Sequence, residues 1–162
     1  MGRMHRLAAF LVPAGICAMW TVFAGKDVNW DLLNYHYYAP FALLAGRLQQ
    51  DFFAASAQGY LNPLGYLPFY LMEASGWHSV ITSVALALAH SLNLALLYFI
   101  AQRLFAHRTA PERRVFCVLA TALGAATSVF WATVGSSFLD PLLCAPMLAR
   151  SEERRVGKEC RS

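Results

Sequence analysis

Most of the residues that could do chemistry in this chain gather in one short stretch, residues 26–38. Asp27 and Asp31 supply carboxylates there, and a carboxylate can take a proton from an acceptor hydroxyl or orient it. Lys26 and His36 carry donors that can pair with a phosphate through charge-assisted hydrogen bonds. The aromatic rings of the same stretch can stack on the faces of a sugar. Together these residue types predict a site for a polar group that is attached to a lipid tail.

The stretch directly follows an apolar run, residues 7–24, which is about long enough to cross the roughly 30 Å hydrocarbon core of a bilayer. Hydrophobic residues make up 58% of the chain and charged residues 14%, and the mean hydropathy is +0.44. Soluble domains carry about 25% charged residues. Residues 78–105 and 115–134 also look like spanning helices, and a fourth apolar run opens at Leu139 but stops at Arg150. We therefore expect an all-α polytopic helical membrane protein with three complete transmembrane helices plus a truncated fourth.

The distribution of Lys and Arg predicts which side of the membrane each segment faces, because cytoplasmic loops carry an excess of these residues. Arginines precede the first apolar run and cluster between the second and third, so these places and the N-terminus are expected to be cytoplasmic. The segment 25–77 is more acidic and should face outward, and Asp140 should return to the same outer face. We expect an integral protein of a bacterial inner (plasma) membrane, with the lipid bilayer as a partner.

The outward segment is expected to form juxtamembrane helices between the first two spans. Residues 30–48 have a composition compatible with a helix, but Pro40 forbids an uninterrupted one and predicts a kink or break near Ala39. The aromatic stretch 60–72 is interrupted by prolines and is too short to span a bilayer. It is typical of an interfacial or re-entrant piece.

Residues 150–162 resemble the translation of a common sequencing-adapter oligonucleotide fused to a truncated reading frame, although a genuine basic cytoplasmic tail is the alternative. If the segment is non-native, residues 1–149 form the N-terminal part of the membrane domain of a longer protein. That part has eight basic and six acidic residues, a balance that does not indicate a nucleic-acid partner. Cys17, Cys117 and Cys144 lie inside apolar runs, without the Cys/His spacing of a zinc site or of a disulfide framework.

Four motifs follow one another along the chain before residue 150. The first is an outward Asp-x-x-x-Tyr motif, formed by Asp31 and Tyr35, directly after a short apolar run. The others are a Pro-aromatic segment at 62–70, a span that closes Arg-Leu-Phe at 97–105, and a Leu-Asp-Pro at 139–141. In this order the motifs resemble the membrane-embedded GT-C glycosyltransferases, specifically the branch that contains protein mannosyltransferases and the aminoarabinose transferase of lipid A.

The resemblance implies a GT-C transmembrane domain and an inverting transfer of a sugar from a polyprenyl-phosphate donor to an acceptor glycan, lipid or protein on the outer face. It implies that Asp31 activates or orients the acceptor and that Asp140 is the second acidic residue of the site. This branch is regarded as metal-independent, so no metal or other cofactor is expected, and the chain without its further spans is expected to be inactive. Relatives often carry a lysine for the donor phosphate where this chain has Asn62. The expected substrate-binding residues are Lys26, Asp27, Tyr35, His36 and Asn62.

Several of these residues also have purely structural interpretations. Asp31 could cap an interfacial helix, Asp140 could begin a helix before a proline, and Asp27 could be a plain loop carboxylate. His90 and Asn93, one turn apart, indicate interhelical hydrogen bonding rather than a proton path. For the whole protein the alternatives are a transporter-like protein or a non-catalytic assembly factor, and for the first apolar run a secretory signal peptide.

Overall fold

The computed structural model describes residues 3–25, 27–51 and 55–159, with side chains described as far as Ser151. Within these residues every regular element is helical, which confirms the all-α prediction. The long helices are α1 (Arg3–Ala24), α4 (Ser79–Leu104), α5 (Ala110–Ala125) and α7 (Asp140–Glu159). The short ones are a π-helix (Leu32–His36), α2 (Tyr38–Leu44), two 3-10 helices (Ser56–Tyr60 and Pro63–Tyr66), α3 (Leu67–Ala74) and α6 (Ser128–Thr133).

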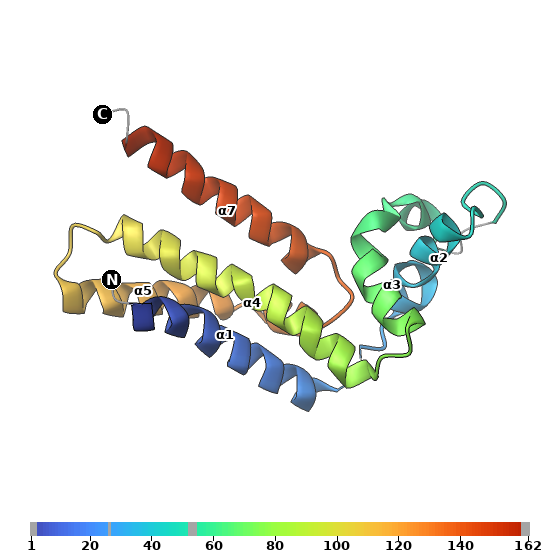
Figure 1. The fold of residues 1–162 in the computed structure, drawn as a ribbon, viewed down its shortest axis with the longest axis horizontal. Helices are drawn as coiled ribbons and strands as arrows, with labels where there is room; N and C mark the ends of the chain where they lie inside the picture. Colours follow the sequence, from blue (N-terminus) through green and yellow to red (C-terminus); the bar gives the residue numbers. More distant parts are fainter. Residues whose placement is uncertain (1–2, 26, 52–54, 160–162) are drawn as a thin grey trace.

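Helix α4 is the central element of a bundle, and α1, α5 and α7 pack against it (Figure 1). A core of small and aliphatic side chains joins these helices: Cys17 of α1, Ala87 and Leu94 of α4, and Val134 after α6. The short helices between α1 and α4 lie together at one end of the bundle, at the right of Figure 1. The first residues of α1 lie at the other end, near the connection from α4 to α5. Residues 27–38 are therefore at the opposite end of the bundle from the arginines of the α1 start and the α4–α5 connection.

Among the described residues, α1 and α4 are the helices that are long and apolar enough to cross a membrane. The prediction of three complete spans is therefore wrong, because the described residues contain two such helices. The third window is not a single helix, because α5 ends at Ala125 and the side-chain oxygen of Thr127 accepts a hydrogen bond from the Phe130 amide (3.3 Å) to begin α6. Helix α7 continues past Arg150 but does not meet the same criterion. Two such helices are weak evidence by themselves, since signal sequences and core helices of soluble proteins share these properties.

The helix break expected near Ala39 lies at Tyr37 instead. Pro40 falls in the first turn of α2, where a proline is tolerated. Its effect reaches backward, because it has no N–H to bond the carbonyl of His36 as an α-helix would require. The chain before it forms a wider turn, in which the Tyr37 amide donates to the carbonyl of Leu32 (3.4 Å).

The connection between α6 and α7 is buried and passes close to α1. Gly135 has φ +76° there, and a Cβ at this position would lie 2.3 Å from Oγ1 of Thr21, so only glycine fits. The Gly135 amide donates to Nδ1 of buried His90 (3.1 Å), and Nδ2 of Asn93 donates to the carbonyl of Pro141 (2.7 Å). His90 and Asn93 thus bond to neighbouring segments, as their positions predicted. Through these bonds α4 holds both ends of the connection in place.

Candidate functional site

The π-helix turns two consecutive side chains, Tyr35 and His36, toward the interior, where they are 6% and 1% exposed. Segments of π-helix are rare and frequently occur at functional sites. The His36 ring stacks on Tyr66 with 4.4 Å between centroids and 19° between planes, and Tyr35 meets Tyr66 edge-on at 5.9 Å. Phe138, from the α6–α7 connection, lies nearly perpendicular to the imidazole of His36, with 5.1 Å between the ring centroids. These rings form an aromatic cluster at the end of the bundle.

A chain of hydrogen bonds ties this cluster to residues on both sides of it. The hydroxyl of Ser137 lies 2.7 Å from Nδ1 of His36, although the two residues are 101 positions apart. Asp27 accepts two bonds at Oδ2, from the Ser137 amide (2.8 Å) and from the Ser137 hydroxyl (2.9 Å). Asn29 donates to the other oxygen of Asp27. The side chains Asp27, Ser137 and His36 therefore form one connected relay, and Asp27 is not a plain loop carboxylate.

The single hydroxyl hydrogen of Ser137 determines which ring nitrogen of neutral His36 carries the proton. Ser137 has one hydroxyl hydrogen, and an ionised carboxylate is the stronger of its two possible acceptors. When Ser137 donates to Asp27, its oxygen accepts from Nδ1–H of His36. The neutral ring then carries its lone pair on Nε2, the nitrogen on the far side from Ser137.

Burial lowers the pKa of His36 below its ordinary value, because the surrounding aromatic rings disfavour the charged imidazolium. The negative charges of Asp31, Asp27 and Asp140 act in the opposite direction, but burial is the larger effect. His36 is therefore neutral at pH 7, although three carboxylates surround it. A neutral ring suits a positioning role better than a role as the main cation for a phosphate.

Asp31 lies half-buried at the start of the π-helix and, within the described residues, makes no capping hydrogen bond. The capping interpretation is thus wrong for Asp31: the Leu32 amide is bound instead by the side-chain oxygen of Asn29 (2.7 Å). The carboxylate of Asp31 instead interacts with the phenol of Tyr35. Burial, the charge of Asp31 and hydrogen bonding with Asp31 and Tyr66 raise the pKa of Tyr35 to about 12. The phenol therefore stays protonated and can hold the carboxylate.

Asp140 reaches the same cluster from the other end of the sequence. It is the exposed first residue of α7, and the bond from Asn93 to the carbonyl of Pro141 anchors that turn to α4. After burial, the charges of Asp140 and Asp31 are the next largest causes that raise the pKa of Tyr66. The structure thus places Asp27, Asp31 and Asp140 at the same end of the bundle as Tyr66 and His36.

One of the expected substrate-binding residues, Asn62, stands apart from this cluster. Asn62 is exposed, and its side-chain oxygen accepts a hydrogen bond from the Leu64 amide (3.0 Å), which caps the second 3-10 helix. Lys26 lies outside the described residues. The described residues of the aromatic cluster therefore place a neutral histidine and tyrosines beside carboxylates.

The carboxylate of Asp51 provides a contrast within the same layer of short helices. Arg47 binds it through two hydrogen bonds, Nε to Oδ2 (2.6 Å) and Nη2 to Oδ1 (2.7 Å), and Tyr38 donates to it as well. Hydrogen bonds from Arg47 and Tyr38 lower the pKa of Asp51. Asp51 is thus occupied by a structural ion pair, whereas among the described residues no lysine or arginine forms an ion pair with Asp31 or Asp140.

Two members of the site were not anticipated as such. Tyr66 was expected only to lie at the membrane interface, and Ser137 carried no signal at all, since its role depends on contacts with a segment about a hundred positions away. In the described part of the chain, no group of three or more His, Cys, Asp or Glu side chains is arranged to hold a metal ion.

We compared the chain with protein families, curated proteins and solved structures. It matches none of them. The geometry of the cluster and the motifs along the sequence therefore have to carry the functional argument.

Proposed function

We propose that the chain is part of a membrane glycosyltransferase of GT-C type, which transfers a sugar from a polyprenyl-phosphate donor to an acceptor outside the cytoplasm. One observation carries the proposal. Asp31 and Asp140, the two acidic residues that the resemblance assigns to catalysis, both act on Tyr66 and His36 at one end of an apolar bundle. Separate parts of the chain converge on one place where a carboxylate could work.

Membrane insertion is supported by how little of the apolar surface the bundle covers. Only 11% of the apolar window in α1 and 44% of that in α4 is buried. A core helix of a soluble protein would be mostly buried, but Leu11, Met19 and Phe23 of α1 are 66%, 59% and 86% exposed. An apolar surface of this extent requires either lipid or further helices around it.

The distribution of the arginines supports one orientation of the bundle in the membrane. By the positive-inside rule the end with the start of α1 and the α4–α5 connection faces the cytoplasm. The aromatic cluster then lies at the outer surface of a bacterial inner membrane.

The chemistry follows from the positions of the groups. Asp31 takes or orients the proton of the acceptor hydroxyl as its oxygen bonds to the anomeric carbon of the sugar. The bond from that carbon to the donor phosphate breaks, and polyprenyl phosphate leaves with the electron pair. The protonated phenol of Tyr35 holds the carboxylate in place. Asp27 and Ser137 lock the His36 ring, and that ring supports Tyr66. Asp140 adds a second negative charge at the exposed start of α7. There it can accept a hydrogen bond from a hydroxyl of the acceptor or of the sugar. Lys26 and Asn62 remain proposed contacts to the donor.

The direct test is a sugar-transfer assay in membranes that contain the uninterrupted parent protein, with Asp31→Asn compared with wild type at equal expression. Loss of a general base costs about 10²- to 10⁴-fold in rate. Asp51→Asn is the matched control, because Asp51 is held in a structural ion pair outside the cluster, and it should leave transfer nearly unchanged. Full activity of the Asp31→Asn protein would reject catalysis at this site and favour a non-catalytic assembly factor.

A further inference from the structure

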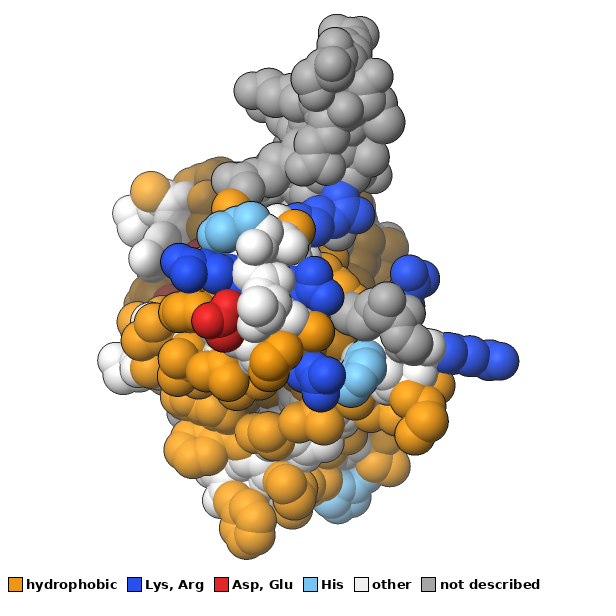
Figure 2. All heavy atoms as spheres, turned by 90° about the vertical axis from the view of Figure 1, so that its left-hand side faces the viewer, with side chains coloured by type: hydrophobic (Ala, Val, Ile, Leu, Met, Phe, Trp, Pro, Cys, Tyr) orange, Lys and Arg blue, Asp and Glu red, His pale blue; other side chains and the backbone are white. Residues whose placement is uncertain are grey.

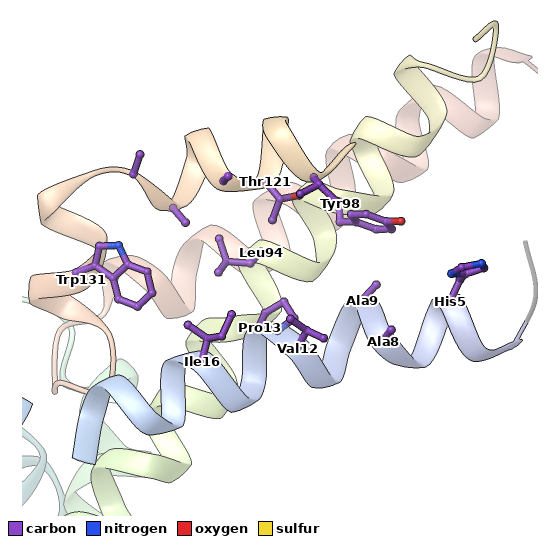
Figure 3. A pocket seen from close by; sticks show the side chains of 14 residues that line it. His5, Ala8, Ala9, Val12, Pro13, Ile16, Leu94, Tyr98, Thr121 and Trp131 are labelled. Carbon is purple, nitrogen blue, oxygen red and sulfur yellow. The ribbon is translucent and has the colours of Figure 1, made fainter. Parts of the chain in front are cut away.

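A groove of about 580 Å³ runs along the bundle, away from the aromatic cluster. Helix α4 forms its floor with Leu94 and Tyr98, while α1 and α5 form its walls (Figure 3). The lining is almost entirely apolar, and small alanines on both walls leave the space that forms the groove. Its volume falls within the range of about 300–1,000 Å³ that is typical of small-molecule sites.

The two ends of the groove differ in chemistry. One end stops at Trp131, whose carbonyl accepts a hydrogen bond from the indole of Trp20 (2.8 Å). At the other end the groove reaches His5 and Tyr98, and the same two residues line a second, polar hollow with Arg113 and Arg114. Figure 2 shows this end of the molecule, where Arg and His side chains gather above the apolar flank of the bundle. The groove is thus apolar along its length and basic at the end that holds His5.

We propose that this groove binds one anionic glycerophospholipid, with an acyl chain between α1 and α5 and the phosphate at Arg113 and Arg114. Charge complementarity at the mouth selects an anionic head group, and the apolar walls select a hydrocarbon chain. The length also fits. From His5 to Ile16 the α1 wall covers about 16 Å at 1.5 Å per residue, close to half of the roughly 30 Å hydrocarbon thickness of a bilayer. The groove therefore matches the depth of one leaflet.

The proposed lipid is not the sugar donor. Its head group lies at the start of α1, whereas Asp27 follows the end of that helix, about 30 Å away at 1.5 Å per residue. The reacting phosphate of a donor has to lie near Asp31. The inference rests on the membrane insertion proposed above but not on the transferase chemistry.

The test is native mass spectrometry of the full chain in detergent with added phosphatidylglycerol or with phosphatidylcholine of the same acyl chains. Phosphatidylglycerol should bind one to one, and phosphatidylcholine should bind far less. A basic residue near an anionic head group contributes about fivefold in affinity, so Arg113→Gln combined with Arg114→Gln should weaken phosphatidylglycerol roughly 30-fold. Arg108→Gln is the control, because Arg108 lies over the Phe116 ring and lines neither the groove nor the polar hollow that holds Arg113 and Arg114.

A second pair of variants tests the chain-binding part. Ala122→Phe fills the groove and should abolish bound lipid, whereas Leu119→Phe, on the same helix but outside the lining, should not. Equal binding of both lipids, or unchanged phosphatidylglycerol affinity in the double arginine variant, would overturn the proposal. Displacement of phosphatidylglycerol by an equal concentration of polyprenyl phosphate would also overturn it, since the groove would then belong to the donor. These readouts need no sugar transfer, so they fail independently of the Asp31 assay.

Discussion

At the end of the bundle that holds Asp31, polar side chains are hydrogen-bonded to one another. At the end that holds Arg113 and Arg114, the polar side chains instead border an open groove. Asp27, Ser137 and His36 are joined by hydrogen bonds of 2.7 to 2.9 Å in the first region. The second region offers exposed guanidinium groups beside apolar walls. A site that does chemistry needs fixed groups. A site that binds a lipid needs only the right charge and a slot of the right length.

The comparison predicts that substitutions in the hydrogen-bonded region are costly to stability. Ser137→Ala leaves Asp27 and Nδ1 of His36 without the hydroxyl that joins them, and a buried polar group left unpaired costs about 1–3 kcal/mol. The neighbouring Ser136 is similarly buried, but its hydroxyl bonds only to backbone groups close by in sequence: it donates to the carbonyl of Thr133 (2.6 Å) and accepts from the amide of Phe138 (3.3 Å). Ser136→Ala should therefore cost about 1 kcal/mol or less.

Free energies of unfolding from denaturant titration in detergent micelles, followed by tryptophan fluorescence, would compare the two serine variants. Equal losses for both would show that the relay adds nothing beyond ordinary local hydrogen bonding. A larger loss for Ser136→Ala would contradict the assignment of Ser137 as the joining residue.

The neutral state of His36 predicts a dependence of stability on pH. Its pKa is lower in the folded protein than the ordinary value of 6.5, so the unfolded chain binds the proton more readily. Stability should therefore fall as the pH drops below about 6.5, with a slope of at most about 1.4 kcal/mol per pH unit from this group. The loss should level off once the pH is below the folded pKa.

Comparing His36→Asn with His107→Asn isolates that slope, because His107 is exposed on the α4–α5 connection. The His36 variant should lose its share of the pH dependence, and the His107 variant should keep it. A wild-type protein that becomes more stable on acidification to pH 5 would mean that the three surrounding carboxylates, rather than burial, control the histidine.

The smallest effect is expected at the basic end. Arg108 lies over the ring of Phe116 with 5.6 Å to the centroid, a contact that contributes about 0.5–1 kcal/mol at an exposed position. Arg108→Ala should thus change the free energy of unfolding by no more than this amount in the same titration. A loss comparable to that of Ser137→Ala would remove the distinction between the two ends.

Sequence patterns predicted the features that depend on local composition. The long apolar runs 7–24 and 78–105 correspond to α1 and α4, and the distribution of Lys and Arg predicted one side of the membrane for Asp31 and Asp140, which lie at the same end of the bundle. The break between α5 and α6 was missed, because a hydropathy window averages over Thr127, whose side chain begins a new helix. The break before Pro40 was expected and lies two residues earlier than Ala39, at Tyr37, because the pattern shows that a proline interrupts a helix but not that the preceding turn widens.

Contacts between distant segments were beyond the sequence alone. Ser137 gains its role because Gly135 lets the connection approach Thr21, and because His90 and Asn93 hold that connection from α4. Each of these residues looks ordinary by itself. Their combined effect appears only when α1, α4 and the connection are packed together.

The most direct test of the account asks whether positions 31 and 140 face the same compartment. Asp31→Cys and Asp140→Cys would each be made in a chain with its own cysteines replaced, and intact cells would be treated with a membrane-impermeant thiol reagent. Both engineered thiols should react from outside, while a cysteine in place of Arg108 should react only after the cells are opened. Labelling of positions 31 and 140 from opposite sides would contradict a shared site.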